Sequence, residues 1–346
     1  MRAPPGLNLH YVTATEYRLA RWSDVLGIAS FDASEAVSAR TAGIPIAHVS
    51  TPVLPAAAQV CEVWRCGESA ESGQHDGVRF RRGGDVLFGC IAVAEAEQAG
   101  VQPGVKAHSP LQEATAQAYR RICATLDAEN YPYLLRVWNY LPDINRDEGG
   151  AERYRQFNAA RRHALHACGR AAGGNVPAAS ALGSKPASPL VVYFLAGRVP
   201  PTFVENPRQV SAYRYPREYG AHPPSFSRAA LVRQRGAITL FISGTASIVG
   251  HRSRHVGDTA AQTRETLANI EALLAEANRA TRGARFELGA LACKVYVRRP
   301  ADLPLVQAEL EDTLGKGGRA IYLQADICRQ DLLVEIEAAA MYPCAA

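Results

Sequence analysis

The sequence has few lysines for its length. Of 346 residues only those at positions 106, 185, 294 and 316 are lysine, although lysine and arginine together number 38. Arginine therefore supplies almost all of the positive charge, and the net charge of the chain is +5. Arginine holds carboxylates and phosphates bidentately, so this balance suits a small dianionic ligand. No dense basic run with interleaved aromatic residues occurs, which argues against nucleic acid as a partner.

Long apolar stretches are also missing. No segment reaches the roughly 20 residues that a transmembrane helix requires, so no membrane association is expected. The first residues, Met1–Gly6, are followed by a mixed polar stretch and not by the apolar core of a signal peptide. The eight cysteines show no paired CxxC spacing, which favours reduced thiols over a disulfide framework. These features together predict a cytoplasmic protein.

Clusters of metal ligands are scarce as well. His163, His166 and Cys168 lie close together on a predicted helix, but no second group of ligands is evident near them. We interpret these residues as an ordinary helix face. Neither a metal nor an organic cofactor is expected.

The two halves of the chain repeat one pattern. A buried strand at 85–90 precedes a helix at 109–128 and a strand at 135–140. In the same way, a strand at 237–244 precedes a helix at 259–280 and a strand at 293–298. Each second strand is followed by a turn with proline and aspartate, at 142–143 and 300–302. The pattern predicts an α+β protein of two fused units, each a mixed sheet with helices on one face, and a ligand cleft between or within them.

The predicted boundaries place an N-terminal unit at 1–170, a crossover loop at 171–188 and a C-terminal unit at 189–346. The first unit begins with short strands near 9–12, 25–29, 46–49 and 61–64 and also contains a helix at 151–170. Residues 67–84 are polar and rich in glycine, which predicts an exposed loop. Residues 209–215 alternate in polarity, which predicts a strand.

The end of the chain holds two strands joined by a polar turn at 328–331. In the second of them Leu333, Glu335 and Glu337 share one face. A strand this apolar is expected to be central, and burial there raises the pKa of a carboxyl until it donates protons near neutral pH. The alternative is that both glutamates lie on a solvated face of the sheet.

The second unit resembles the YjgF/RidA fold through three segments: 224–229, the strand end Leu240–Thr245, and Glu335-Ile-Glu-Ala338. The arginine of RidA deaminases is not matched, because Arg319 lies one position off, and this argues against imine deamination. The chain as a whole resembles the chorismatases from about residue 135 onward. The segments that carry this resemblance are 154–161, 210–216, 224–228, 242–251, 257–269, 294–298, and Cys328 seven residues before Glu335.

This resemblance implies cleavage of chorismate to pyruvate and 3-hydroxybenzoate, with 4-hydroxybenzoate as a further product. It assigns the role of proton donor to Glu335 and a lesser catalytic role to Cys328. The candidates for holding the substrate are Arg155, Arg161, Tyr140, Tyr213, Arg214, Tyr215, Ser243, Gly244, Thr245, Ala246 and Arg298. Arg298 is expected to occupy the position in the second unit that Tyr140 occupies in the first.

Two other interpretations stay open from the sequence. One is hydrolysis of chorismate to a dihydroxycyclohexadiene carboxylate and pyruvate, and the other is a non-catalytic RidA-like protein that binds a small molecule. The oligomeric state is not determined by the sequence. RidA proteins are trimers with sites between subunits, whereas a fused pair can enclose a site within one chain, so a monomer is favoured over a trimer.

Overall fold

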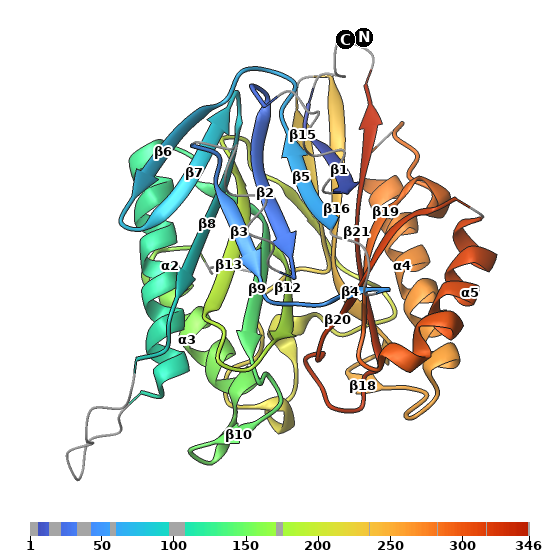
Figure 1. Cartoon of the computed structure of the whole chain (residues 1–346). Helices are drawn as coiled ribbons and strands as arrows, with labels where there is room; N and C mark the ends of the chain where they lie inside the picture. Colours follow the sequence, from blue (N-terminus) through green and yellow to red (C-terminus); the bar gives the residue numbers. More distant parts are fainter. Residues whose placement is uncertain are drawn as a thin grey trace.

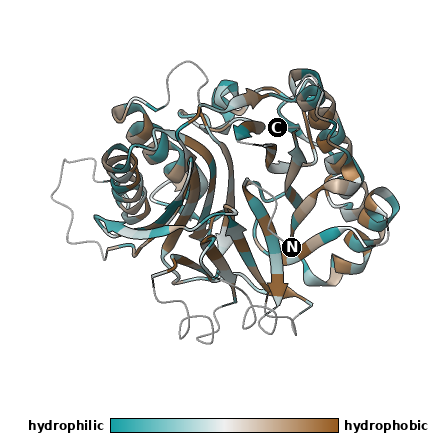
Figure 2. Ribbon diagram, turned by 90° about the horizontal axis from the view of Figure 1, so that it is seen from above, coloured by the Kyte–Doolittle hydropathy of each residue, from teal (hydrophilic) through white to brown (hydrophobic). Residues whose placement is uncertain are grey.

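The structure is a computed structural model that describes residues 6–13, 22–32, 43–55, 60–96, 108–170, 176–234, 236–281, 283–315 and 317–344. In this part of the chain, three larger sheets of four, six and seven strands surround a common core (Figure 1). Helices cover the outer faces of the two largest sheets (Figure 2). The α+β class predicted from the sequence is confirmed.

The first repeated unit is a six-stranded sheet in the order β12-β9-β13-β8-β7-β6. Its helices α2 and α3 pack against each other beside the sheet. In chain order its elements are β6 (Glu71–His75), β7 (Val78–Gly83), β8 (Val86–Val93), α2 (Pro110–Glu129), β9 (Tyr133–Pro142), α3 (Arg153–Ala167), β12 (Ala178–Ser184) and β13 (Leu190–Gly197). The short strands β10 (Asp147–Glu148) and β11 (Ala151–Glu152) pair with each other just before α3.

The second unit is a seven-stranded sheet in the order β14-β15-β16-β21-β19-β20-β4. In chain order its elements are β14 (Thr202–Val204), β15 (Ala229–Gln234), β16 (Ala237–Ala246), α4 (Thr259–Thr281), β19 (Ala292–Val297), α5 (Leu303–Leu314), β20 (Arg319–Gln324) and β21 (Val334–Pro343). The last strand, β21, lies between β16 and β19, as its apolar sequence predicts. A further short pair, β17 (Ile248–Val249) and β18 (Arg252–Ser253), follows β16.

The internal repeat is confirmed by strand order and direction. In each unit the central strand, β13 or β21, is antiparallel to both of its neighbours, and the strand after the second helix is parallel to β9 or β19. The register corrects one predicted match. Tyr140 pairs with Val191 and Tyr296 pairs with Glu335, so Tyr296, and not Arg298, corresponds to Tyr140. The hydroxyl groups of the two tyrosines meet at 2.6 Å in the core between the units.

The N-terminal strands form a separate sheet in the order β1-β5-β2-β3, which packs against the inner faces of both units. These strands are β1 (Asn8–Thr13), β2 (Val25–Phe31), β3 (Ile46–Val49) and β5 (Val60–Arg65), and β4 (Val53–Leu54) joins the edge of the second unit at β20. Trp64 lies in one buried cluster with Phe88 and Trp138 of the first unit and Phe241 of the second. The three sheets therefore share one core, and the four strands predicted here are confirmed.

Three local predictions are wrong. Residues 71–83, predicted as an exposed loop, form the β6–β7 hairpin, whose turn is Asp76-Gly77 with positive φ at both residues, as tight hairpins require. Residues 212–214, predicted as strand, form a 3-10 turn. Residues 178–184, predicted as part of a crossover loop, form strand β12, and β13 after it also belongs to the first sheet. The small side chains that suggested a loop are buried, and they let β12 pack closely against β16.

Polar side chains cap the starts of two helices. Ser109 caps α2 in a capping box with Gln112, and the side chain of Asp258 accepts a hydrogen bond from Ala261 at the start of α4. Helix α3 begins at Arg153, two residues after its predicted start. None of the helices among the described residues combines the length and the apolar character needed to cross a membrane.

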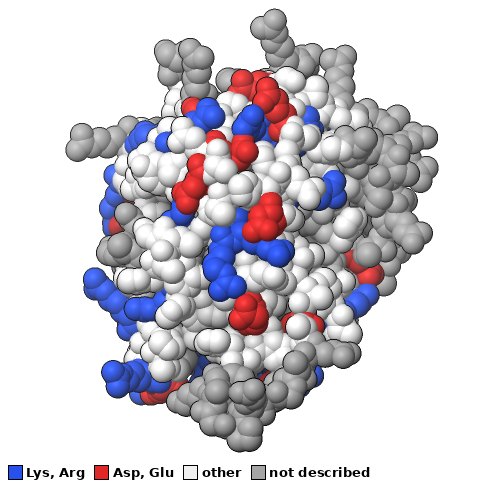
Figure 3. Space-filling model, turned by 90° about the vertical axis from the view of Figure 1, so that its left-hand side faces the viewer, with Lys and Arg blue, Asp and Glu red and all other residues white. Residues whose placement is uncertain are grey.

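The surface on the side of α2, β6 and β7 carries charges of both signs (Figure 3). Arginines there are paired with acidic residues: Arg82 with Glu71 and Glu129, and Arg120 with Glu113. Such a mixed surface lacks the broad positive field that nucleic acid binding uses.

Candidate active site

A cavity of about 570 Å³ lies where the two units meet. Its lining comes from the start of α3, from the segment 215–228, from the end of β16, and from the loop 328–331 that leads into β21. A narrow inner extension of about 30 Å³ continues past Tyr154 and Phe226 to Arg161 and Ser180. Glu335 and Cys328 line both spaces, so they mark the deep end of the cavity.

Glu335 is a buried carboxyl group that faces this cavity. It is 3% exposed, and its side chain accepts no hydrogen bond from any residue that the structure describes. Burial, reinforced by the negative charge of Glu337, raises the pKa of Glu335 to about 8 against the opposing pull of Arg136, Arg228 and Arg298. This raised pKa favours the protonated form at neutral pH, and the residues that the structure describes offer its proton no hydrogen-bond acceptor.

The backbone of β16 makes room for this carboxyl. The pairing of β16 with β21 shifts between Ile242 and Thr245, so a bulge falls at Ser243-Gly244. A Cβ atom on Gly244 would overlap Oε1 of Glu335. The backbone itself forms the wall against which the acid rests, so any residue larger than glycine would displace the Glu335 carboxyl group.

Three arginines around the cavity each have an unsatisfied donor. Nε of Arg161, Nε of Arg228 and Nη2 of Arg329 are buried and lack a hydrogen-bond partner among the described residues. A buried donor without a partner costs about 1–3 kcal/mol, so an anionic ligand that accepts these hydrogen bonds is stabilised. These arginines give the cavity a positive lining that suits a ligand with carboxylates.

Aromatic side chains orient two of these guanidinium groups. Arg228 donates to the hydroxyl of Tyr215 at 2.8 Å, and to the carbonyl of Val210 at 2.9 Å. The guanidinium of Arg329 stacks 4.2 Å from the ring centre of Tyr219 and donates to the carbonyl of His251 at 2.9 Å. Because each guanidinium is fixed by such contacts, its unused N–H group is already oriented before a ligand arrives.

Cys328 lies between acidic groups at the deep end of the cavity. Burial raises the pKa of its thiol to about 12, with the charge of Glu335 acting in the same direction. At neutral pH the side chain is a thiol and not a thiolate, and only a thiolate is an effective nucleophile. As a neutral thiol, Cys328 is suited to shaping the cavity and to weak hydrogen bonding.

The structure places seven of the predicted site residues at the cavity and six elsewhere. Those at the cavity are Glu335, Cys328, Arg155, Arg161, Tyr215, Gly244 and Ala246. Those that do not line it are Tyr140, Tyr213, Arg214, Ser243, Thr245 and Arg298. Arg319, too, lies away from the cavity, on β20, where it donates to the carbonyl of Leu9.

The six residues elsewhere make other contacts. Tyr140 is in the core with Tyr296, and Tyr213 stacks with the exposed side chain of Arg214. The hydroxyl of Ser243 joins the units, because it accepts from the Ala179 amide at 2.9 Å and donates to the Ser227 carbonyl at 2.6 Å. The Thr245 hydroxyl donates to the Ser243 carbonyl, which holds the bulge in place.

Arg298 supports the cavity indirectly. It donates to the carbonyls of Ile327, Arg329 and Leu332, and so fixes the loop that carries Cys328 and Arg329. Sequence reasoning did not select Arg228, Arg329 or Tyr219 as candidates. Two sequence features could have indicated these arginines as site residues: Arg228 ends one of the matched segments, and Arg329 directly follows Cys328.

Comparison with known proteins gives the family. A family model described as "Chorismatase FkbO/Hyg5-like, N-terminal" matches residues 62–196. A 3-hydroxybenzoate synthase from Streptomyces hygroscopicus is 37% identical over 298 residues, 84% of each chain. A chorismatase from Streptomyces rapamycinicus is 38% identical over 284 residues, 80% of each chain. The chain belongs to the chorismatase family.

A crystal structure of a chorismatase at 1.08 Å resolution agrees with the fold of this chorismatase. The two share 30% sequence identity and a TM-score of 0.84, over 98% of this chain and 99% of the other. Smaller solved proteins, such as a YjgF/YER057c/UK114 family member from Mycobacterium tuberculosis, match 40% of this chain at 24% identity and a TM-score of 0.28. The predicted family and the predicted α+β fold are confirmed by the curated relatives and by the chorismatase crystal structure.

Proposed function

We propose that this chorismatase converts chorismate to pyruvate and 3-hydroxybenzoate. The observation that carries the proposal is the buried carboxyl of Glu335, which has no hydrogen-bond partner among the described residues and lies at the end of a cavity whose arginines have unused donors. Chorismate fits this arrangement, because it has two carboxylates, a vinyl ether and a ring hydroxyl. The relative named 3-hydroxybenzoate synthase supports the choice of product.

The first step is transfer of the Glu335 proton to the terminal methylene carbon of the enolpyruvyl group. Carbon accepts protons slowly, so the acid must lie close to the carbon and have a raised pKa. The new C–H bond leaves an oxocarbenium ion, and the Glu335 carboxylate stabilises this positive charge in a site with few competing water molecules.

The remaining steps need no further reactant. The ring hydroxyl oxygen adds to the oxocarbenium carbon, and its proton passes to the original ether oxygen, which separates from that carbon and stays on the ring as the 3-hydroxyl group. The bond between ring carbon 4 and the transferred oxygen then breaks, so the side chain leaves as pyruvate, and the C–H proton on ring carbon 3 is lost as the ring becomes aromatic. The Glu335 carboxylate is placed to take up this proton and return to its starting state. If water attacked the cation instead, the product would be a dihydroxycyclohexadiene carboxylate.

Product analysis tests the function. The purified protein is incubated with chorismate, and pyruvate and aromatic acids are quantified by liquid chromatography. Equal amounts of pyruvate and 3-hydroxybenzoate are expected. Pyruvate with a dihydroxycyclohexadiene carboxylate would correct the product, and binding of chorismate without pyruvate release would refute the enzymatic role.

The pH dependence of kcat/KM is expected to report Glu335. Because the protonated form is the active form, kcat/KM should fall as the pH rises through about 8, the pKa of this group in the free enzyme. Initial rates of pyruvate formation between pH 6 and roughly 10 at constant ionic strength measure the profile. A rate that stays constant or increases through this range would contradict the assignment.

Replacing Arg329 by glutamine is expected to weaken chorismate binding about 10- to 150-fold, since a hydrogen bond to a charged group contributes about 1.5–3 kcal/mol. The dissociation constant is measured by calorimetry in the Glu335→Gln background, where chorismate is not consumed. Arg214→Gln is the control, because that arginine is exposed and does not line the cavity. Equal weakening in both variants would remove Arg329 from the proposed site.

We further propose that the chain acts as a monomer in the cytoplasm. The cavity is lined by residues of both units within one chain, so no second copy is needed to complete it. All eight cysteines are free thiols, in keeping with a reducing compartment. Light scattering of the purified protein tests the oligomeric state, and a trimer would overturn that part.

A further inference from the structure

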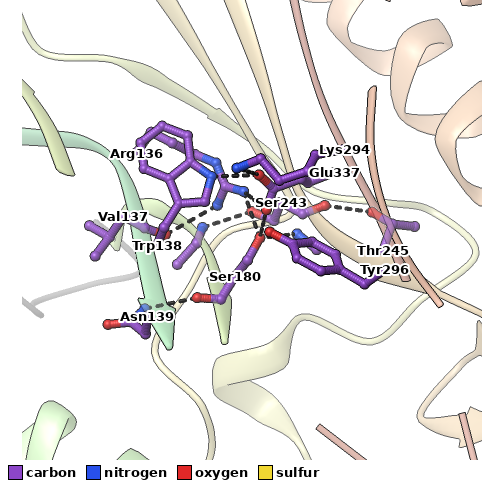
Figure 4. Close-up of polar contacts among 12 residues, drawn as sticks. Arg136, Val137, Trp138, Asn139, Ser180, Ser243, Thr245, Lys294, Tyr296 and Glu337 are labelled. Atoms are coloured by element: carbon purple, nitrogen blue, oxygen red, sulfur yellow. Dashed lines mark hydrogen bonds and ion pairs between the residues drawn. The ribbon is translucent and has the colours of Figure 1, made fainter. Parts of the chain in front are cut away.

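Four charged side chains form a buried network in the core between the sheets, and Figure 4 shows three of them, Arg136, Lys294 and Glu337. Each sheet contributes to it: Glu62 comes from β5, Arg136 from β9, and Lys294 and Glu337 from β19 and β21. All four side chains are at most 5% exposed. Glu337 pairs with Arg136 and with Lys294, each at 2.8 Å, and Lys294 also pairs with Glu62.

Glu337 is held in its ionised form. Besides its two cations, its carboxylate accepts hydrogen bonds from Nε1 of Trp138 at 2.6 Å and from the hydroxyl of Ser180 at 2.5 Å. Burial alone would raise the pKa of Glu337, but Lys294 and Arg136 outweigh burial and lower it. The network thus balances two positive charges against two negative ones, which permits its burial.

Ser180 connects this network to the acid. Its hydroxyl oxygen donates to Glu337 and accepts the amide N–H of Gly244 at 3.0 Å. Gly244 is the residue whose backbone packs against Oε1 of Glu335. Glu337 also lies two residues from Glu335 on the same face of β21, so its negative charge opposes a second negative charge on that face.

We propose that Glu337 is a positioning residue, which keeps Glu335 protonated through its charge and fixed in place through Ser180 and Gly244. This inference rests on the proposed function, because it assigns a purpose to a protonated Glu335. It also gives the N-terminal sheet a role, since Glu62 supplies the second negative charge on Lys294.

Other groups around Glu335 differ in their effect on its pKa: some lower it, and others carry no charge at physiological pH. The positively charged ones, Arg136, Arg228 and Arg298, favour its ionised form. Tyr154 and Cys328 are neutral at physiological pH, because burial raises the pKa of each. Among the described residues that shift the pKa of Glu335 most, Glu337 is the one with a negative charge, so it is the residue to test. The other charged residues that line the same cavity are Asp147, Glu152, Arg155, Arg161, Arg329 and Asp331.

The test compares Glu337→Gln with Glu62→Gln. Both variants remove one carboxylate from Lys294 and keep the side-chain shape, but only Glu337 lies beside Glu335. In Glu337→Gln the decline of kcat/KM is expected at a pH lower by about one unit or more. In Glu62→Gln it should stay near its position in the unchanged protein. Glu337→Asp keeps the negative charge, so in this variant the decline of kcat/KM should lie close to its pH in the unchanged protein. The same decline in all three variants would overturn the proposal.

A milder variant covers the case in which Glu337→Gln does not fold. Ser180→Ala leaves all four charges in place and removes the connection to Gly244, so kcat should fall about tenfold while the pH of the decline is unchanged. An unchanged kcat would refute the connection through Ser180. If the unchanged protein itself releases no pyruvate, the proposed function fails. The titration of Glu335 can then still be followed without substrate, by infrared spectroscopy of its protonated carboxyl against a Glu335→Gln reference.

Discussion

Glu335→Gln is expected to lower the rate of pyruvate formation from chorismate by about 10³- to 10⁴-fold, near the upper limit for the loss of a general acid. The amide has almost the same shape as the protonated carboxyl but gives up no proton. It also cannot become the carboxylate that stabilises the oxocarbenium ion. Steady-state rates with a coupled pyruvate assay measure the loss.

The same variant should fold and bind normally. Because the unfolded chain releases the Glu335 proton at a lower pH than the folded protein does, this carboxyl destabilises the fold increasingly between about pH 4.5 and pH 8. The melting temperature of the glutamine variant should exceed that of the unchanged protein over this range, and the difference should become constant above pH 8. Chorismate should bind with a dissociation constant within about threefold of the KM. Activity above about a tenth of the original would show that another group delivers the proton.

Gly244→Ala is expected to reduce kcat about 100-fold, because the new methyl group occupies the position of Oε1 of Glu335 and displaces the acid from the reacting carbon. Backbone strain does not explain the expected loss, since Gly244 is not among the residues with positive φ. Rates and melting temperature are measured together.

Gly289→Ala is the matched control for this change. Gly289 also lacks a positive φ, and an added Cβ there would meet only the carbonyl of Leu314 at an ordinary distance of 3.6 Å. Its activity should stay within about twofold of the original. If Gly244→Ala keeps full activity, then the close contact between the glycine and the acid has no part in catalysis.

Much of the fold is predictable from the sequence because its signals are local. Ser109 and Asp258 mark helix starts, and the apolar run 334–340 marks a central strand. The hairpin at 71–83 and strand β12 were missed because their residues are polar or small. Phe80 alone does not reveal a buried face, and the small residues of β12 are buried through its pairing with β9 and its contact with β16, both distant in sequence.

The site is predictable only in part for the same reason. Glu335 is recognisable as a carboxyl in an apolar strand, but Arg228 and Arg329 look like ordinary surface arginines until the chain brings them to one cavity. The charged network is less visible still. Glu62, Arg136 and Lys294 each lie on a different strand, and nothing in the local sequence of any of them indicates the other two.

The most direct test of the central claim is the titration of one carboxyl in the unchanged protein, free of substrate. Difference infrared spectra against Glu335→Gln isolate the absorption of its protonated form. We predict that this absorption persists at neutral pH and disappears around pH 8. If it disappears near pH 4 to 5, in the usual range for glutamate, then Glu335 is ionised under physiological conditions and cannot be the proton donor.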